Sequence, residues 1–342
     1  MTKENRPRLL LIDTFKLLAL IAIFTLHSNE FIFFEDDFPL GEAAPFYHYI
    51  KIFLARPMSL GGQIIVGIVY FLYGLRGIGR KKFFKVAFLA LFGQFIFSLV
   101  FGLVEWDIYF YVSFVSFVFA FTNEKIWNRW GVIILSFFIL WIPTELITNN
   151  APQGHLWDVL TGRYTMKNCA SWPLLPWFFL SSLTYGLGLK ARDNWDKLTE
   201  LKKWEFIFWP SAFLISLPVL GHYFWVPIGP HFYDFVFKQS PWIFWGNYIF
   251  IVFFIRLAFV KQVQEATQKS RFFNFISNLC WVQHVGIIYF VSVFYVALGT
   301  LFYETFLVKP HIFDLFYMSG YPVCEFTVRG LKKLFTMVRK PR

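Results

Sequence analysis

Long apolar runs alternate with short polar segments along almost the whole chain. Apolar runs that are long enough to cross about 30 Å of hydrocarbon lie at 9–33, 58–76, 83–104, 107–122, 131–148, 172–190, 205–221, 241–260, 273–302 and 311–328. This pattern predicts an all-α fold, a polytopic bundle of about ten transmembrane helices. We expect residues 1–342 to form a single integral membrane domain.

The segments between the runs predict how the bundle is oriented. Basic clusters alternate with acidic or aromatic loops, and basic loops stay in the cytoplasm. The basic ends carry Lys3, Arg6 and Arg8; Arg76, Arg80, Lys81 and Lys82; Lys125 and Arg129; Lys190, Arg192, Lys197, Lys202 and Lys203; Lys261, Lys269 and Arg271; and the tail from Arg329 to Arg342. Both termini are therefore predicted to be cytoplasmic, which agrees with an even number of spans. No small-residue cleavage site follows the first run, so we expect it to remain as a helix.

Composition supports the membrane interpretation and excludes other classes. Hydrophobic residues make up 57% of the chain, charged residues 15%, and the mean hydropathy is +0.53, which is too apolar for a soluble domain of 342 residues. The net charge of +11 does not indicate nucleic-acid binding, because the basic residues lie in patches between apolar runs. We expect a multi-pass protein of the bacterial inner (cell) membrane.

Cysteine and histidine spacing gives no sign of a metal site. The three cysteines contain no C-x-x-C pair, and the histidines show no H-E-x-x-H or similar spacing. We therefore predict neither a structural zinc nor a catalytic metal.

The first run carries polar residues that are costly inside a membrane and are therefore candidates for function. Lys16 and His27 are separated by three helical turns plus about 20°, so they share one helix face about 16 Å apart. Asp13 lies one turn before Lys16 and can pair with it. An alternative is that His27 is an interfacial residue and that Lys16 snorkels to the inner surface.

His27 has the chemistry of a general base, because the ordinary pKa of imidazole, about 6.5, permits either protonation state at neutral pH. Glu30, one turn further on, could orient it. The separation of about 16 Å argues against Lys16 contacting the same reacting carbonyl as His27. We therefore expect Lys16 to have a binding or structural role first.

These residues resemble a known family. Ile12-Asp13, Lys16 and His27 are similar to the opening helix of the acyltransferase 3 superfamily, whose pattern is I-D, two residues, Arg, ten residues and His. Lys16 stands where most members have Arg, which keeps the charge but loses the planar fork.

Later segments resemble one branch of that superfamily, the heparan-alpha-glucosaminide N-acetyltransferase-like proteins. The run from Trp172 to Trp177, followed by Gly186 and Gly188, is similar to the P-L-L-P-W segment and glycine-containing helix of the branch. Segment 66–104 also fits it, and 277–284 is similar to a late helix with a serine followed by a histidine. The chain departs from the pattern in having no Asp before Trp172.

The resemblance implies transfer of an acyl group, usually acetyl, from cytoplasmic acyl-CoA to a hydroxyl or amine of a glycan across the membrane. His27 matches the catalytic histidine of the family, and either base-assisted attack or an acyl-His27 intermediate is open. Basic residues at the inner rim could attract the CoA phosphates, although ordinary positive-inside retention is the preferred explanation for any single one of them. These residues are Arg76, Arg80, Lys81 and Lys82.

Other residues are candidates for contact with the glycan acceptor. Asp107, Trp172 and Trp177 lie near predicted outer ends, where aromatic faces suit sugar rings, although the two tryptophans also fit an aromatic belt. His284, with Ser277 and Gln283 nearby, either lines the cavity or is a satisfied core histidine.

Two further function classes remain open. In a transporter or flippase of a lipid-linked saccharide, Asp13, Lys16 and His27 would form a proton or substrate relay. The sequence shows neither the internal duplication nor the paired broken helices common in such proteins, which favours the enzyme. The third class is a member of the family that binds acyl-CoA without turnover. Lys16, which stands where most members have Arg, is the residue that keeps this class open.

Overall fold

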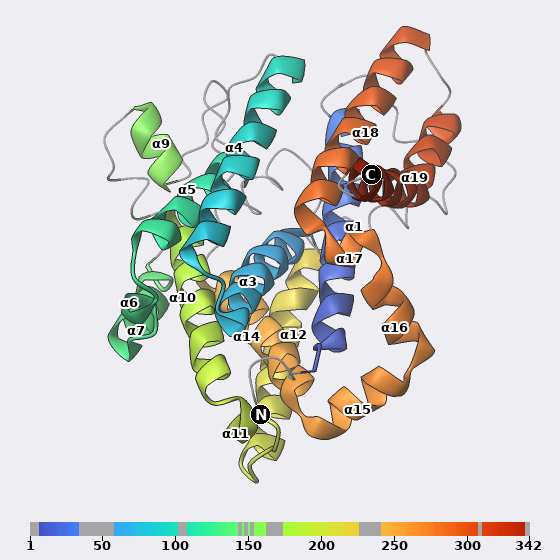
Figure 1. The fold of residues 1–342 in the computed structure, drawn as a ribbon. Coiled ribbons are helices and arrows are strands. Elements are labelled where there is room, and N and C mark those ends of the chain that lie inside the picture. The colour runs from blue at the N-terminus through green and yellow to red at the C-terminus, as the bar shows by residue number, and fades with distance from the viewer. Residues whose placement is uncertain are drawn as a thin grey trace. The chain divides into compact units, whose positions relative to one another are not determined.

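The computed structural model describes residues 7–33, 58–101, 108–142, 146, 150, 154–161, 174–225, 241–306 and 310–338, which contain helices and no strand (Figure 1). The helices are α1 (Leu10–Phe33), α3 (Met58–Arg76), α4 (Arg80–Phe101), α5 (Ile108–Phe121), α6 (Glu124–Trp127), α7 (Trp130–Ile139), α9 (His155–Thr161), α10 (Leu174–Asp193), α11 (Trp195–Leu198), α12 (Glu205–Trp225), α14 (Pro241–Phe259), α15 (Lys261–Lys269), α16 (Arg271–Asn278), α17 (Cys280–Gln283), α18 (Val285–Phe306) and α19 (Pro310–Val338). The all-α prediction is confirmed for this part of the chain.

The principal helices follow most of the apolar runs. In the run 131–148 a span was predicted, but α7 ends at Ile139 and the chain turns at residues 140–142. The run 273–302 also differs from the prediction. A single span was expected there, and the structure instead has α16, α17 and α18 in succession. The backbone leaves helical geometry at Leu279 (φ −68°, ψ 143°) and again at His284 (φ −129°, ψ 47°). The expectation of one continuous helix is therefore wrong in this run.

The chain divides into two compact units, and the first comprises residues 1–65 and 261–342. Helix α1 packs against α15, α16, α17 and α18, and α18 packs against α19. The buried positions of α1 recur every three or four residues, as expected for one packed helix face. They include Ile12, Asp13, Lys16, Ala19, Leu20 and Ile23.

The second unit comprises residues 66–260. Helix α10 contacts α5, α6, α7, α9 and α11, while α4 packs on α5 and α12 on α14. The backbones of α3 and α10 approach closely at Gly74 and Gly188. A Cβ on Gly74 would overlap the carbonyl oxygen of Tyr185, and one on Gly188 would overlap that of Phe71. Only glycine permits this helix contact.

The outer helix surfaces are strongly apolar. Among the described residues, one helical segment, Arg80–Leu99, is long and apolar enough to cross a membrane. Shorter apolar helical segments lie at Ile65–Arg76, Ile108–Phe121, Trp130–Ile139, Glu205–Leu217 and Val285–Gly299. Exposed side chains on these surfaces include Phe88, Leu89, Phe92, Phe95, Leu99, Phe206, Ile207, Leu214, Ile215, Leu298 and Leu301. A bundle of ten transmembrane helices stays a prediction.

Candidate functional site

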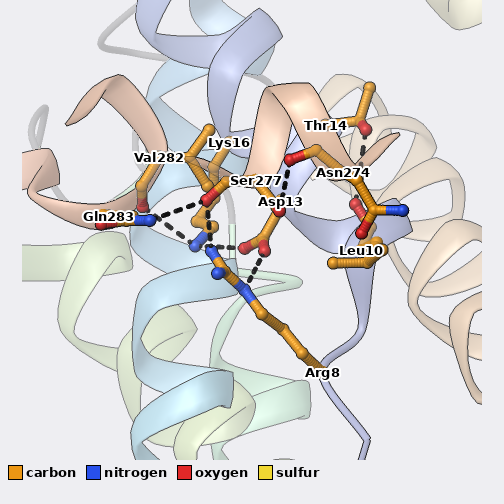
Figure 2. A network of polar contacts seen from close by, with 9 residues as sticks. All are labelled: Arg8, Leu10, Asp13, Thr14, Lys16, Asn274, Ser277, Val282 and Gln283. Carbon is orange, nitrogen blue, oxygen red and sulfur yellow. Dashed lines mark hydrogen bonds and ion pairs between the residues drawn. The ribbon is translucent and has the colours of Figure 1, made fainter. Parts of the chain in front are cut away.

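An ionic network with a buried Asp13–Lys16 pair and an exposed Arg8 lies at the start of α1, in the first unit (Figure 2). Lys16 Nζ is 2.6 Å from Asp13 Oδ1, and Arg8 Nε donates to Asp13 Oδ2 at 2.5 Å. The side chains of Asp13 and Lys16 are 3% and 7% exposed. The Asp13–Lys16 pair predicted from their spacing is therefore confirmed.

The two cations of this network also bond to the backbone of the broken helix (Figure 2). Lys16 Nζ donates to the Val282 carbonyl at 3.2 Å. The Ser277 carbonyl accepts from an Arg8 terminal nitrogen at 2.9 Å and from Gln283 Nε2 at 3.1 Å. These carbonyls belong to the last turns of α16 and α17, where the helix provides no partner. The two cations thus donate to carbonyl groups that accept no hydrogen bond within their own helices. They also lie at the C-terminal ends of α16 and α17, where the helix dipole is negative.

The N-terminal end of α17 is capped by the carboxylate of Glu325. Glu325 on α19 accepts the backbone N–H of Cys280 at 2.9 Å and that of Trp281 at 3.2 Å. Arg329 Nε donates to the same carboxylate at 2.7 Å. The first N–H groups of a helix have no internal acceptor, so Glu325 acts as a cap supplied by another helix. A carboxylate at the start and an ammonium at the end match the polarity of α17.

A pocket of about 480 Å³ adjoins this break, within the first unit. Its volume lies in the range of small-molecule sites, roughly 300–1,000 Å³. It is lined by Leu17 and Ile21 of α1; by Phe275, Leu279 and Trp281 of the broken helix; and by Tyr321, Pro322, Glu325, Phe326 and Arg329 of α19. Apart from the Glu325–Arg329 pair and the Tyr321 hydroxyl, the wall consists of apolar and aromatic side chains.

His284 stands at the second break, immediately after α17. Its backbone N–H donates to the Cys280 carbonyl at 2.9 Å, and its ring is half-buried. Nε2 is buried and has no hydrogen-bond partner among the described residues. The structure thus brings His284 to the same helix break as the Lys16 contact on Val282, and its role as a cavity-lining or a core histidine stays a prediction.

Several predicted site residues lie outside the described part of the chain. Asp107 and Trp172 are in undescribed segments, and the side chains of His27 and Glu30 are likewise outside the description, although α1 includes both positions. The predicted contact between Glu30 and His27 therefore stays a prediction.

The basic residues assigned to CoA binding belong to the second unit. Arg76 ends α3, and Arg80, Lys81 and Lys82 begin α4; all four are exposed. The turn between the helices passes through Gly77, which has φ +59°. The Arg80 guanidinium donates to the Ala120 carbonyl and lies 6.0 Å from the centre of the Phe121 ring.

Trp177, a predicted acceptor contact, also belongs to the second unit. Its side chain is buried, and its carbonyl accepts the Tyr111 hydroxyl at 2.7 Å. The same hydroxyl is 2.6 Å from Ser181 Oγ on the next turn of α10. This packing fixes the start of α10 within the unit.

Sequence reasoning missed the roles of Glu325 and Arg8. Glu325 is a carboxylate inside the apolar run 311–328, and the criterion that singled out Asp13 and Lys16 applies to it equally. From the sequence, Arg8 belongs to the basic N-terminal cluster, and its spacing of five residues from Asp13 does not predict a helical pair.

Comparisons with protein families, with curated proteins and with solved structures find no match to this chain. Within the described segments, no group of three or more His, Cys, Asp or Glu side chains is arranged to hold a metal ion.

Proposed function

We propose that this chain is a multi-pass membrane acyltransferase that moves an acetyl or other acyl group from cytoplasmic acyl-CoA to a hydroxyl or amine of an extracytoplasmic glycan. The observation that carries the proposal is the buried Asp13–Lys16 pair on α1, bonded to the broken helix. Such polar groups inside apolar helices mark substrate or proton pathways. The resemblance of this helix to the acyltransferase 3 superfamily selects acyl transfer as the chemistry.

The membrane placement rests on the helix surfaces. Side chains such as Phe92 on α4 and Ile207 on α12 are 61% and 75% exposed. Large contiguous apolar surfaces are rare on soluble monomers, and acyl chains would cover them in a bilayer. The basic segments then lie at the cytoplasmic side, where acyl-CoA is found.

The assignment of His27 as general base rests on its position along α1. Lys16, Leu20 and Ile23 form a buried stripe, and position 27 continues it at helical spacing. An imidazole there would take the proton from the acceptor hydroxyl or amine as the new bond to the thioester carbonyl forms.

Lys16 has a positioning role in this proposal. Its ammonium contacts Asp13 and the Val282 carbonyl, so it ties α1 to the break rather than reaching the thioester. The assignment of the CoA phosphates to Arg76, Arg80, Lys81 and Lys82 rests on the charge and exposure of these residues alone, which belong to the other unit.

The test is release of free CoA thiol by the purified protein supplied with acetyl-CoA and a panel of sugar acceptors. His27→Ala should lower the rate by about 10²-fold or more, whereas Leu18→Ala, an exposed position of the same helix, should not. Thiol release that survives in His27→Ala would show the assigned role to be wrong. Mass spectrometry of surface glycans from cells with and without the gene would identify the acyl group and its acceptor.

Lys16→Arg separates an active enzyme from a member that only binds acyl-CoA. If the wild type binds acetyl-CoA without turnover and Lys16→Arg creates turnover, the lysine is responsible for inactivity. Unchanged inactivity in Lys16→Arg would exclude this one-residue explanation.

A transporter or flippase of a lipid-linked saccharide is the second candidate, and the helix break favours it. Discontinuous helices with exposed backbone ends are a recurring feature of transporter substrate sites. In this chain, Lys16 and Glu325 occupy the ends of α17. Saccharide translocation by proteoliposomes without any thiol release would support the transporter over the enzyme.

A further inference from the structure

The pocket beside the broken helix has the size and lining of a site for a hydrocarbon chain. Leu17 and Ile21 form one wall, and Leu279, Trp281 and Phe326 contribute others. Its volume of about 480 Å³ is larger than that of a packing defect and lies in the range of small-molecule sites. Its apolar lining favours an uncharged, flexible chain over a sugar or a nucleotide.

The charged side chains at the pocket favour an anionic group outside it. Glu325 is engaged by the N–H groups of Cys280 and Trp281 and by Arg329 Nε. The Arg329 side chain is 51% exposed, and Lys332, one turn later, is also exposed. The Glu325 carboxylate is buried and bonded to backbone N–H groups. The exposed charged side chains beside the pocket, Arg329 and Lys332, are therefore cationic.

The pocket opens on a surface that combines large apolar and basic side chains. Phe275 and Phe326 line it and are themselves 64% and 70% exposed. Neighbouring exposed residues on α16 and the end of α19 are Arg271, Phe272, Leu331, Lys332, Lys333 and Leu334. Helices with this mixture lie at the boundary between acyl chains and anionic headgroups.

The predicted topology places this surface at the cytoplasmic leaflet. Arg271 precedes the ninth apolar run and Arg329 follows the tenth, so both mark cytoplasmic ends. The cytoplasmic leaflet is also the negatively charged one, and it attracts basic residues that lie near its surface.

We propose that this pocket binds one acyl chain of an anionic phospholipid from the cytoplasmic leaflet, with the phosphate held by Arg329 and Lys332. The proposal rests on the membrane placement made under the proposed function but not on acyl transfer. Its occupant is a lipid molecule that stays bound, and the polar network at Asp13 and Lys16 is separate from it.

The test uses the full chain in nanodiscs that contain phosphatidylglycerol with a photoreactive diazirine in its acyl chain. After irradiation, mass spectrometry should find adducts on peptides covering 17–21, 275–281 or 321–326. We expect several-fold more adduct than with phosphatidylcholine carrying the same chain. Adducts spread evenly over the apolar helices, or equal for the two lipids, would overturn the proposal.

Matched variants sharpen the result. Ile21→Trp fills the pocket and should remove the adducts at these peptides, while Leu18→Trp adds the same ring at an exposed position and should not. Arg329→Gln should reduce the preference for phosphatidylglycerol more than Lys333→Gln, which removes the same charge outside the pocket lining. If Ile21→Trp behaves as the wild type, the lipid is not in the pocket.

Two arms separate this proposal from the proposed enzyme. His27→Ala should crosslink as the wild type does, because lipid binding requires no turnover. Competition by long-chain acyl-CoA that removes the adducts, where excess phosphatidylglycerol does not, would assign the pocket to the acyl donor and overturn the lipid proposal.

Discussion

At the residue scale, the buried charges of the first unit are matched to unpaired backbone groups. Asp13 receives Arg8 and Lys16, Lys16 reaches the Val282 carbonyl, and Glu325 accepts two N–H groups of α17. A buried charge is tolerated when it is paired and hydrogen-bonded. A helix break is tolerated when its free N–H and C=O groups find partners. In this unit the buried side-chain charges provide those partners, and the free backbone groups in turn provide hydrogen bonds to the charges.

Glu325→Ala tests this mutual dependence. The substitution leaves the N–H groups of Cys280 and Trp281 without their acceptor, and an unsatisfied buried polar group costs about 1–3 kcal/mol. We expect a lower melting temperature of the purified protein in detergent. Glu265→Ala, which removes an exposed carboxylate on α15, is the matched control and should leave the melting temperature nearly unchanged. Equal shifts in the two variants would contradict the capping role.

At the element scale, helix contacts in the second unit depend on small residues and on one polar cluster. Gly74 and Gly188 bring α3 and α10 together. The end of α10 is joined to the α5–α7 connection through Arg192, which pairs with Glu124 and with Asp193. Asn128 Nδ2 donates to Asp193 Oδ2 at 2.9 Å.

Alanine at either close-contact glycine should separate α3 from α10. Gly74→Ala and Gly188→Ala each place a methyl group against a backbone carbonyl, and overpacking costs typically about 1–3 kcal/mol. Gly131→Ala in α7, where a Cβ meets nothing within 4 Å, should be neutral or stabilising by up to about 1 kcal/mol. Thermal unfolding of the three variants checks this, and a Gly74→Ala variant as stable as Gly131→Ala would be inconsistent with the contact.

The cluster at the end of α10 should make stability depend on pH in the acid range. Burial alone would raise the pKa of Asp193, but the Asn128 hydrogen bond and the Arg192 charge outweigh it and lower that pKa below its usual 3.8. A pKa lower in the folded than in the unfolded state stabilises the protein above the unfolded value, and this stabilisation is lost as the pH falls through the folded pKa.

Asp193→Asn provides the measurement. Wild type should melt higher than the variant at about pH 6, and the difference should shrink by about pH 3 as the carboxylate is protonated. A difference that is the same at both pH values would show that the Asp193 charge does not contribute.

At the scale of the whole molecule, the distribution of charge predicts which segments face the cytoplasm. Cys169 lies in the predicted outer loop 149–171, outside the described residues, whereas Cys280 and Cys324 are buried. Lys81, in the first turn of α4, is exposed, and it belongs to a segment that is predicted to be cytoplasmic.

Thiol labelling of cells checks this topology. A membrane-impermeant maleimide should label Cys169 in intact cells. In a Cys169→Ser background, Lys81→Cys should be labelled only after permeabilisation. Labelling of Lys81→Cys from outside, or of Cys169 only from inside, would reverse or reject the predicted orientation.

The sequence by itself determined most of the helix positions in the described residues and the Asp13–Lys16 pair, because both depend on local properties. Hydropathy marks each helix within its own segment, and residues three apart on a helix are neighbours whatever the rest of the chain does. The contact between Lys16 and Asp13 could therefore be predicted from a few letters of sequence.

Only the tertiary structure decided where the ninth run breaks. The sequence is apolar across 279–282 and becomes polar only at Gln283 and His284. The break exists because distant groups satisfy it: Glu325, 45 residues from Cys280, and Lys16, 266 residues from Val282. Hydropathy and periodicity carry no information about such partners, because they describe one segment at a time. The pocket has the same origin, since its walls come from segments near 20, 280 and 325 that meet only in the folded chain.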